Sequence, residues 1–237
     1  MLIKKHGGKL LDLFLLLCFL FASVLLVLTA RQVSTVQANI VDNSPCLVID
    51  PGHGGIDGGA IAFNGVKESD INLAIGLKLR SLADFMGLRN VMTREGTQQQ
   101  TEYDRYSEHE DLMQRTELIN SVPNGVLISI HQNFYPTSQP SGAEILYAPG
   151  EKSRVLGEIT QKNLVSLLQP GNRRVAGPAA KNLYIPSHIS CPGILAECGF
   201  LSNITDLELL TQDRYQTSLA AVLLLSYLQF LFSDIHT

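Results

Sequence analysis

The stretch from Leu47 to Gly59 constrains the fold of this chain more than any other. The apolar run 46–49 has the pattern of a buried β-strand, and an acid, a proline and a cluster of glycines follow it at once. Such runs, bounded by turn residues, are typical of strands covered on both faces of a parallel sheet. His53 stands in the glycine-rich turn, at the carboxyl end of the strand, where open α/β sheets bind ligands.

Two later segments repeat this pattern and also end in residues that can do chemistry. The runs 125–131 and 192–197 are apolar and finish at His131 and Glu197. Shorter strands are expected over 90–94 and over 142–147, the latter at the edge of the sheet. A helix is expected with Ser69 or Asp70 as its N-cap and Gly87 as its stop, and further helices are expected over 112–120, 151–168 and 214–232. This alternation predicts a single α/β domain, with a twisted, mostly parallel sheet and helices on both faces.

Three further stretches are less regular or harder to assign. Residues 98–111 are polar without an apolar stripe, which predicts a long surface loop. Residues 172–182 are basic and irregular; they form either a solvated surface or a face for an anionic substrate. The helix over 214–232 is apolar enough to resemble a membrane span, but its interspersed polar residues favour a packed amphipathic helix.

The N-terminal segment has the composition of an export signal. Lysines precede a run of 18 uncharged residues from Leu13 to Ala30, just long enough to span a bilayer. Residues 1–30 are therefore an uncleaved signal anchor or a cleaved signal peptide, since residues 36–38 resemble a cleavage site. Either alternative exports the remainder, membrane-anchored or secreted on the outer side of the cytoplasmic membrane. Residues 31–45 are expected to be a linker, and residues 46–237 the catalytic domain.

Charge and cysteine content exclude several classes of protein. A formal net charge of −4 gives no reason to expect a nucleic-acid partner. The four cysteines form no C-x-x-C pair, which excludes a zinc ribbon and a thioredoxin-like motif. Buried free thiols are expected, because a Cys191–Cys198 disulfide would conflict with the strand predicted between them.

Four side chains are predicted to converge at one edge of the sheet. Parallel strands bring their carboxyl ends together, which gathers His53, His131 and Glu197, and Glu68 follows the first strand after a short loop. Two imidazoles and one carboxylate are the protein ligands of a catalytic zinc, which activates water and polarises a carbonyl. A second carboxylate would shuttle the proton to the leaving nitrogen. Spacing only slightly favours Glu68 as the ligand and Glu197 as the acid/base.

The chain resembles the zinc-dependent N-acetylmuramoyl-L-alanine amidases of the amidase_3 type. The motifs that carry this resemblance stand in order at residues 48–55, 67–73, 92–94, 129–133, 142–144 and 197–203, with a weaker match at 112–120. It implies one Zn²⁺ per chain, held by His53, Glu68 and His131, with Glu197 as the catalytic residue. It also implies hydrolysis of the amide between N-acetylmuramic acid and L-alanine in peptidoglycan, with Asn133 and Arg115 as candidate substrate contacts.

A narrower resemblance is to the germination-specific amidases of spore-forming bacteria. It rests on a single short domain behind an apolar segment, on Gln132 after the second histidine, and on Gly177-Pro178 before Lys181. It implies removal of stem peptides during spore cortex maturation, where muramic-δ-lactam forms, and it leaves room for an activating protein partner. Cell-wall remodelling is the other setting. Two alternative functions stay open: a partner-dependent peptidoglycan-binding protein on the same fold, or another zinc hydrolase such as a polysaccharide deacetylase.

Overall fold

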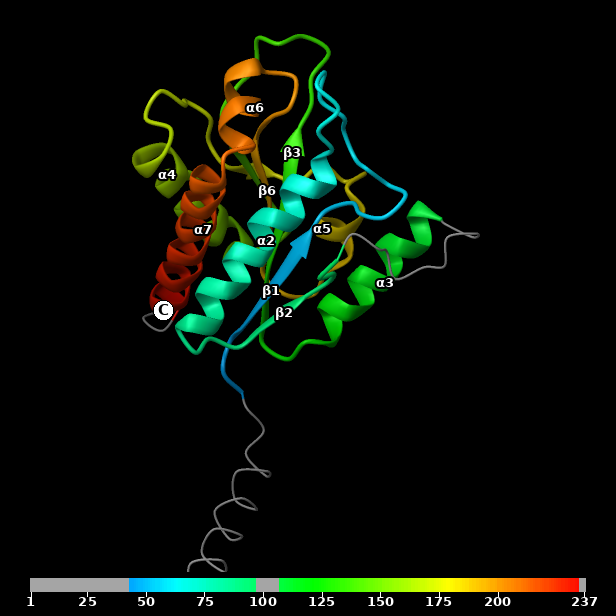
Figure 1. The fold of residues 1–237 in the computed structure, drawn as a ribbon. Coiled ribbons are helices and arrows are strands. Elements are labelled where there is room, and N and C mark those ends of the chain that lie inside the picture. The colour runs from blue at the N-terminus through cyan, green and yellow to red at the C-terminus, as the bar shows by residue number, and fades with distance from the viewer. Residues whose placement is uncertain (1–42, 97–106, 235–237) are drawn as a thin grey trace, which may run out of the picture. The chain divides into compact units, whose positions relative to one another are not determined.

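In the part of the chain that the structure describes, six strands form one sheet in the order β2-β1-β3-β6-β4-β5. Figure 1 labels β1, β2, β3 and β6 of this sheet. The computed structural model describes residues 43–96 and 107–234. The strands are β1 (Cys46–Pro51), β2 (Asn90–Met92), β3 (Gly125–Asn133), β4 (Glu144–Tyr147), β5 (Gly177–Pro178) and β6 (Gly193–Phe200). The helices are α2 (Glu68–Phe85), α3 (Glu108–Ser121), α4 (Glu151–Leu167), α5 (Tyr184–His188), α6 (Ile204–Leu210) and α7 (Asp213–Asp234).

The central strands run parallel and place their carboxyl ends at one edge. β1 pairs with β2 and β3, and β3 pairs with β6, all in parallel. Only β4 runs antiparallel to its neighbour β6, and β5 pairs with β4 in parallel. The predicted mostly parallel sheet is confirmed. The predicted signal segment and most of the predicted linker lie outside the described residues.

Helices cover both faces of the sheet, as the sequence predicted (Figure 1). On one face, α2 and α4 pack on alternate strand residues, α7 packs against these two helices, and together they form the main core. On the other face, α3 and α5 enclose a smaller cluster made of Val48, Ile119, Leu127 and Ile185. Since each central strand buries both of its sides, its sequence is a continuous apolar run rather than an alternating one.

The structure corrects two predictions about the edges of elements. β4 is not at the edge of the sheet, because the two-residue strand β5 pairs beyond it. A strand that short has no periodic pattern to detect. The predicted N-cap of α2, Ser69 or Asp70, is wrong, because Lys67 is the N-cap and the helix begins at Glu68. The backbone N–H groups of Glu68 and Ser69 donate to Ala60 O and Gly58 O. These loop carbonyls replace the side-chain cap that the sequence was expected to supply.

Helix α3 begins four residues earlier than predicted, so the expected loop over 98–111 is wrong at its carboxyl end. Ser107 is the N-cap, and its hydroxyl accepts a hydrogen bond from the N–H of Glu110. Acidic residues fill the first turn, where they complement the helix dipole. Capping and charge stabilise this first turn of α3, so it needs no apolar stripe. A search for apolar periodicity therefore did not detect it. The remainder of the predicted loop, 97–106, is outside the described residues.

The cysteine prediction is confirmed in the part of the chain that the structure describes. Cys191 and Cys198 form no disulfide with each other, so the alternative bridge is excluded, and Cys46 is not disulfide-bonded either. Cys46 and Cys198 are fully buried, while Cys191 is half-buried.

The C-terminal helix α7 is a core element, although its length and apolar composition would allow it to cross a membrane. It packs against α2 and α4, and Leu223 and Tyr227 are completely buried within that interface. Its apolar character therefore reflects burial inside the domain, as the sequence predicted.

Replacing Leu223 with alanine tests this packing. The buried leucine leaves a cavity, so Leu223→Ala should lower the free energy of unfolding by about 2–5 kcal/mol in urea titrations. Leu225, on the same helix, is 38% exposed, and Leu225→Ala should change it by less than about 1 kcal/mol. Equal effects of the two substitutions would contradict a core position for this face of α7.

Candidate metal centre and active site

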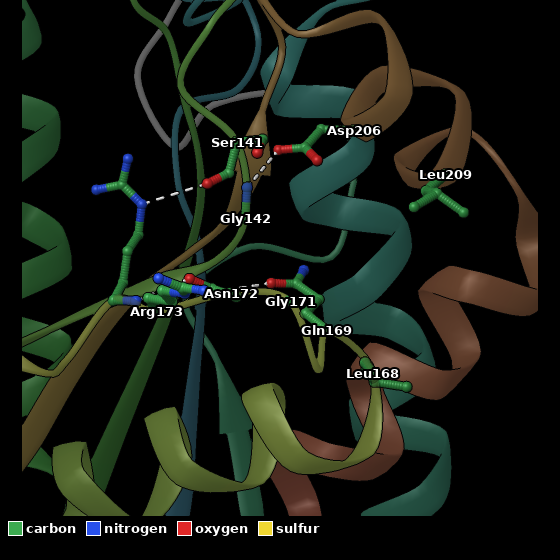
Figure 2. Close-up of a pocket in the computed structure, with 10 residues that line it drawn as sticks. Ser141, Gly142, Leu168, Gln169, Gly171, Asn172, Arg173, Asp206 and Leu209 are labelled. Carbon is green, nitrogen blue, oxygen red and sulfur yellow. Dashed lines mark hydrogen bonds between the residues drawn. The ribbon is translucent and has the colours of Figure 1, made fainter.

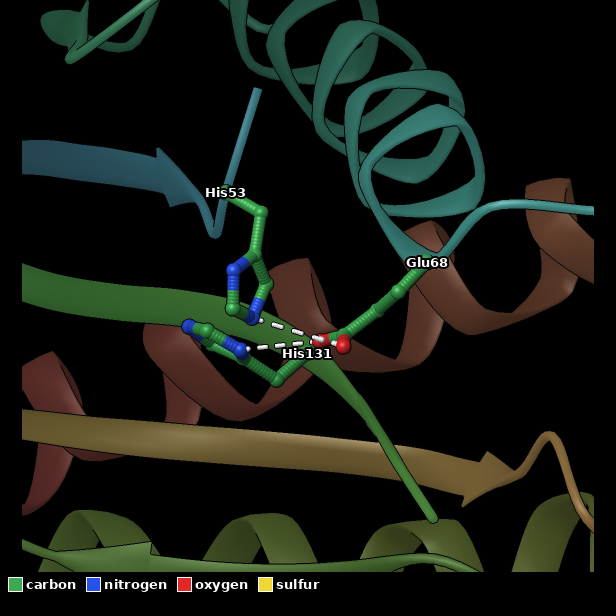
Figure 3. A group of neighbouring side chains, drawn as sticks. All are labelled: His53, Glu68 and His131. Carbon is green, nitrogen blue, oxygen red and sulfur yellow. Dashed lines mark hydrogen bonds and ion pairs between the residues drawn. The ribbon is translucent and has the colours of Figure 1, made fainter. Parts of the chain in front are cut away.

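Three side chains from separate elements converge at the carboxyl edge of the sheet (Figure 3). His53 follows β1, Glu68 opens α2, and His131 lies near the end of β3. His131 Nδ1 is 3.0 Å from Glu68 Oε1, and His53 Nε2 is 3.4 Å from Glu68 Oε2. One ligand atom from each residue lies within 4.8 Å of the others. Two imidazoles and a carboxylate at this spacing fit a tetrahedral divalent ion that keeps one position open.

Glycine is required where the backbone approaches these ligands. A Cβ at Gly52 would lie 2.1 Å from the His131 imidazole. A Cβ at Gly59, which has a φ of +64°, would lie 2.6 Å from Glu68 Oε2. His53 itself has a φ of 59°. The glycines of this turn therefore allow the loop to pack closely around the candidate metal ligands.

Asp57 fixes the orientation of His53. Its Oδ2 lies 2.7 Å from His53 Nδ1, and its Oδ1 accepts a hydrogen bond from the N–H of Gly59. An imidazole that donates from one nitrogen to a carboxylate presents the other nitrogen to a metal. Here that other nitrogen is Nε2, the one that faces Glu68. Sequence reasoning missed Asp57; an acid four residues after a histidine inside a glycine-rich loop was the available signal.

Both oxygens of the Glu68 carboxylate are held by the backbone. Oε2 accepts from Ala60 N at 3.0 Å, and Oε1 accepts from Gln132 N at 3.1 Å. Burial opposes ionisation, but hydrogen bonds with His131 and His53 outweigh it and hold the pKa of Glu68 well below its usual range. Glu68 is therefore ionised, and its negative charge must be balanced by a proton or a cation bound beside it.

The raised pKa of His53 also indicates that the carboxylates of this site need a positive charge beside them. Burial would lower the pKa of its imidazole, but hydrogen bonds to Asp57 and Glu68 raise that pKa to about 10. In the absence of an ion, a proton on His53 balances the surrounding carboxylates. A divalent ion would replace that proton, which links metal binding to proton release.

A buried ion network holds the loop of His53 from below. Asp50 is fully buried and accepts hydrogen bonds from Thr93 and Ser129 at 2.6 Å each. Arg115 on α3 donates to Asp50 at 3.1 Å and to His53 O at 2.7 Å. Burial opposes ionisation of Asp50, but Arg115 and the two hydroxyls keep its pKa lowered.

The place of Arg115 is beneath the loop, not in the catalytic cavity. Its remaining donors reach Pro51 O at 2.9 Å and Asp111 Oδ2 at 2.8 Å, and its side chain is 5% exposed. Arg94 acts similarly from the β2 side, donating to Pro51 O, Gly52 O and Ser69 O. These two buried arginines shape the turn that carries His53. Sequence reasoning did not identify the supporting role of Arg94.

Glu197 lies beside the metal cluster on the neighbouring strand. It is paired directly with His131 in the β3–β6 ladder. Its Oε2 is buried and accepts no hydrogen bond from any residue that the structure describes. Burial raises the pKa of its carboxyl to about 7, partly offset by His131. A carboxyl with a pKa near neutrality can both accept and donate a proton at physiological pH.

The cluster and Glu197 line one cavity of about 350 Å³. Asn133, predicted as a substrate contact, lines it as well. Its opposite wall is formed by α5 and the residues before it, including Tyr184 and Ile185. The four predicted catalytic and ligand residues are therefore brought together around a single space.

A second hollow, of about 600 Å³, lies between the start of β4, α6 and the segment after α4 (Figure 2). Its polar groups bind one another: Asp206 accepts from Gly142 N and Phe200 N, and Asn172 donates to Ala143 O. These contacts fix loops. Of the basic residues predicted nearby, Arg174 pairs with Glu144 at 3.0 Å.

Comparisons with known proteins agree with this fold and this arrangement of side chains. The family model of N-acetylmuramoyl-L-alanine amidases, Amidase_3, matches residues 47–225. The germination-specific N-acetylmuramoyl-L-alanine amidase of Bacillus subtilis (strain 168) is 33% identical over 184 residues, covering 74% of this chain and 75% of that protein. The CwlD amidase of Clostridioides difficile, solved in complex with the GerS lipoprotein, matches with a TM-score of 0.77 at 32% identity, covering 81% of this chain and 100% of that one. AmiC2 of Nostoc punctiforme matches with a TM-score of 0.68 at 28% identity, covering 79% of this chain and 97% of that one.

Fold and site together define the class of this protein as an amidase with a candidate metal centre. The chain belongs to the Amidase_3 family of N-acetylmuramoyl-L-alanine amidases, which act on the bond between the glycan and the stem peptide of peptidoglycan. The resemblance drawn from the sequence motifs, and the enzyme class that it implied, are confirmed.

The buried network beneath His53 can be tested by replacing Arg115. Arg115→Met leaves Asp50 buried without its cation, so the free energy of unfolding should fall by roughly 3–5 kcal/mol. Arg154, which pairs with Glu151 and Glu158 on the surface of α4, is the control. Arg154→Met should change the free energy of unfolding by about 0.5 kcal/mol or less. A loss of similar size in both variants would contradict a special role for the buried pair.

The raised pKa of Glu197 predicts a pH-dependent stability in the metal-free chain. The folded state binds this proton more tightly than the unfolded state, whose ordinary value is 4.5. The resulting stabilisation is complete below about pH 4.5 and is lost as the pH rises through 7, a change on the order of 3 kcal/mol. Relative to wild type, Glu197→Gln should therefore gain stability between pH 5 and pH 8 in EDTA-treated urea titrations. If the stability of wild type and that of Glu197→Gln changed with pH in the same way, the raised pKa of Glu197 would be contradicted.

Proposed function

We propose that this enzyme hydrolyses the N-acetylmuramoyl–L-alanine amide with one zinc ion held by His53, Glu68 and His131, and with Glu197 as the acid/base. The observation that carries the proposal is the placement, beside a His–Glu–His cluster in one cavity, of a buried carboxyl whose Oε2 accepts no hydrogen bond from the described residues. Its donor set of two imidazole nitrogens and one carboxylate favours zinc over magnesium or calcium, which prefer all-oxygen ligands.

When bound, zinc supplies Lewis-acid chemistry, polarising the amide carbonyl and acidifying water. The chain's own residues do the rest. Asp57 keeps the Nδ1 of His53 engaged, so that its Nε2 remains a ligand. Glu197 accepts a proton from the attacking water and returns it to the leaving nitrogen of L-alanine. A pKa near 7 suits one group to both steps.

Substrate contacts come from the walls of the cavity. Asn133 lies two residues after the ligand His131 and lines the cavity, so we assign it a hydrogen bond to the substrate. Arg115 contributes indirectly, because its guanidinium binds the loop of His53 and not the cavity. The apolar wall at Tyr184 and Ile185 suits the methyl groups that flank the scissile amide.

We place this activity in spore cortex maturation. The support is the relative in Bacillus subtilis that is named for germination. There, removal of the stem peptide would leave muramic acid free for conversion to muramic-δ-lactam. General cell-wall remodelling is the other setting.

Export, anchoring and a protein partner complete the proposal. A cell-wall substrate requires the catalytic domain to lie outside the cytoplasmic membrane. Residues 1–30 would export it as a signal anchor or signal peptide. The CwlD amidase of Clostridioides difficile was solved with the GerS lipoprotein, which supports a protein partner for this chain as well.

The proposal predicts what happens when only the proton shuttle is removed. Glu197→Gln keeps the size of the side chain but loses proton transfer, so the rate of peptide release should fall by about 10²–10⁴-fold. Zinc content should stay at one ion per chain. The assay is mass spectrometry of products after incubating the purified full-length chain with zinc and peptidoglycan.

The same assay separates the alternatives. Wild type should release peptides that begin at L-alanine and leave peptide-free glycan. Release of acetate would indicate a deacetylase, and binding without any release would indicate a partner-dependent protein. A Glu197→Gln variant that cleaves at the wild-type rate would contradict the acid/base assignment.

A further inference from the structure

Two buried amides lie behind the metal cluster and link β3 to α2. Gln132 donates from Nε2 to Oδ1 of Asn72 at 3.1 Å. Asn72 in turn donates from Nδ2 to Glu68 Oε1 at 3.3 Å and to Gly52 O at 3.1 Å. Asn72 is 0% exposed and Gln132 is 3% exposed. The chain of contacts therefore ends on a carboxylate oxygen of the candidate metal ligand Glu68 and on the backbone beside His53.

The first amide fixes the orientation of the second. A carboxamide has one donor end and one acceptor end, and only the donor end can bind a carboxylate. Because Gln132 occupies the Oδ1 of Asn72, the amino group of Asn72 must face Glu68. A reversed Asn72 would place its oxygen against the carboxylate oxygen and would leave the donor of Gln132 without its acceptor.

Stability alone does not explain a glutamine at this position. Its Oε1 is buried and accepts no hydrogen bond within the described part of the chain. The neighbouring thiol of Cys198 donates to Ala196 O at 3.6 Å, and the Gln132 amide lies close enough to that thiol to oppose the rise in its pKa. An unpaired buried acceptor is unfavourable, and an apolar side chain of the same length would avoid it. What such a side chain would lose is the donor to Asn72.

We propose that Gln132 and Asn72 are positioning residues that hold the Glu68 carboxylate in the orientation that binds the metal ion. The inference rests on the proposed metal function of the cluster. Glu68 Oε1 faces His131 while Oε2 faces His53, so rotation of the carboxylate would disturb both contacts. Outer contacts of this kind typically contribute 10- to 100-fold to metal affinity.

The test is the dissociation constant for Zn²⁺ of the full-length chain, measured by competition with a chromophoric chelator. Asn72→Leu should weaken binding about 10- to 100-fold. Gln132→Met keeps the length of the side chain and should weaken binding by at least about threefold. Because Gln132 acts through Asn72, adding Gln132→Met to Asn72→Leu should produce no further loss.

Gln161 supplies the matched control. It is also a buried glutamine, 4% exposed, and its amide binds Ile145 N and Ala143 O away from the cluster. Gln161→Met should lower the thermal midpoint of the metal-free chain but leave the Zn²⁺ dissociation constant within about twofold of wild type.

Two outcomes would overturn the proposal, and a third bears on the metal itself. Gln132→Met binding Zn²⁺ as wild type does would remove the positioning role. Additive losses in the double variant would show that Gln132 does not act through Asn72. Absence of Zn²⁺ binding by wild type would instead overturn the metal function of the cluster, which distinguishes the two failures.

Discussion

The structure depends on one buried negative charge, the carboxylate of Glu68. Burial disfavours a charged carboxylate, yet two imidazoles and two backbone N–H groups keep it ionised. The elements around it are shaped accordingly. Gly52 and Gly59 make room for His131 and for the carboxylate itself, and Asp57 turns His53 toward it. A cluster with this excess of negative charge is stable only when a proton or a metal ion balances it.

The rest of the fold supplies the rigidity that such a cluster needs. The carbonyl group of Pro51, where the turn after β1 begins, accepts hydrogen bonds from Arg94 and Arg115. Arg115 is in turn neutralised by Asp50, which sits on β1 and is held by the neighbouring strands. The sheet, buried on both faces, is the frame to which this polar network is fixed. The candidate metal ligands, the turn and the core are therefore held together by one continuous set of contacts.

The sequence predicted the architecture and the four central side chains, because both follow from local patterns. Buried parallel strands are apolar runs with polar ends, and their common direction brings His53, His131 and Glu197 to one edge. The supporting contacts could not be read in the same way. Asp57, Asn72 and Gln132 act through hydrogen bonds whose partners depend on how loops and helices meet in space. The start of α3 and the strand β5 were missed for a related reason: capping and a two-residue pairing carry no periodic apolar signal.

The central claim is that His53, Glu68 and His131 together bind one zinc ion. X-ray absorption spectroscopy at the zinc edge, on the loaded full-length chain, tests it directly. A site built from these three residues should show nitrogen and oxygen donors at about 2.0–2.1 Å from the zinc, with the outer-shell scattering of two imidazole rings. In His131→Ala, the outer-shell scattering should correspond to one imidazole ring instead of two. Sulfur donors at about 2.3 Å, which would mean ligation by the free cysteines, or a spectrum unchanged by His131→Ala, would contradict it.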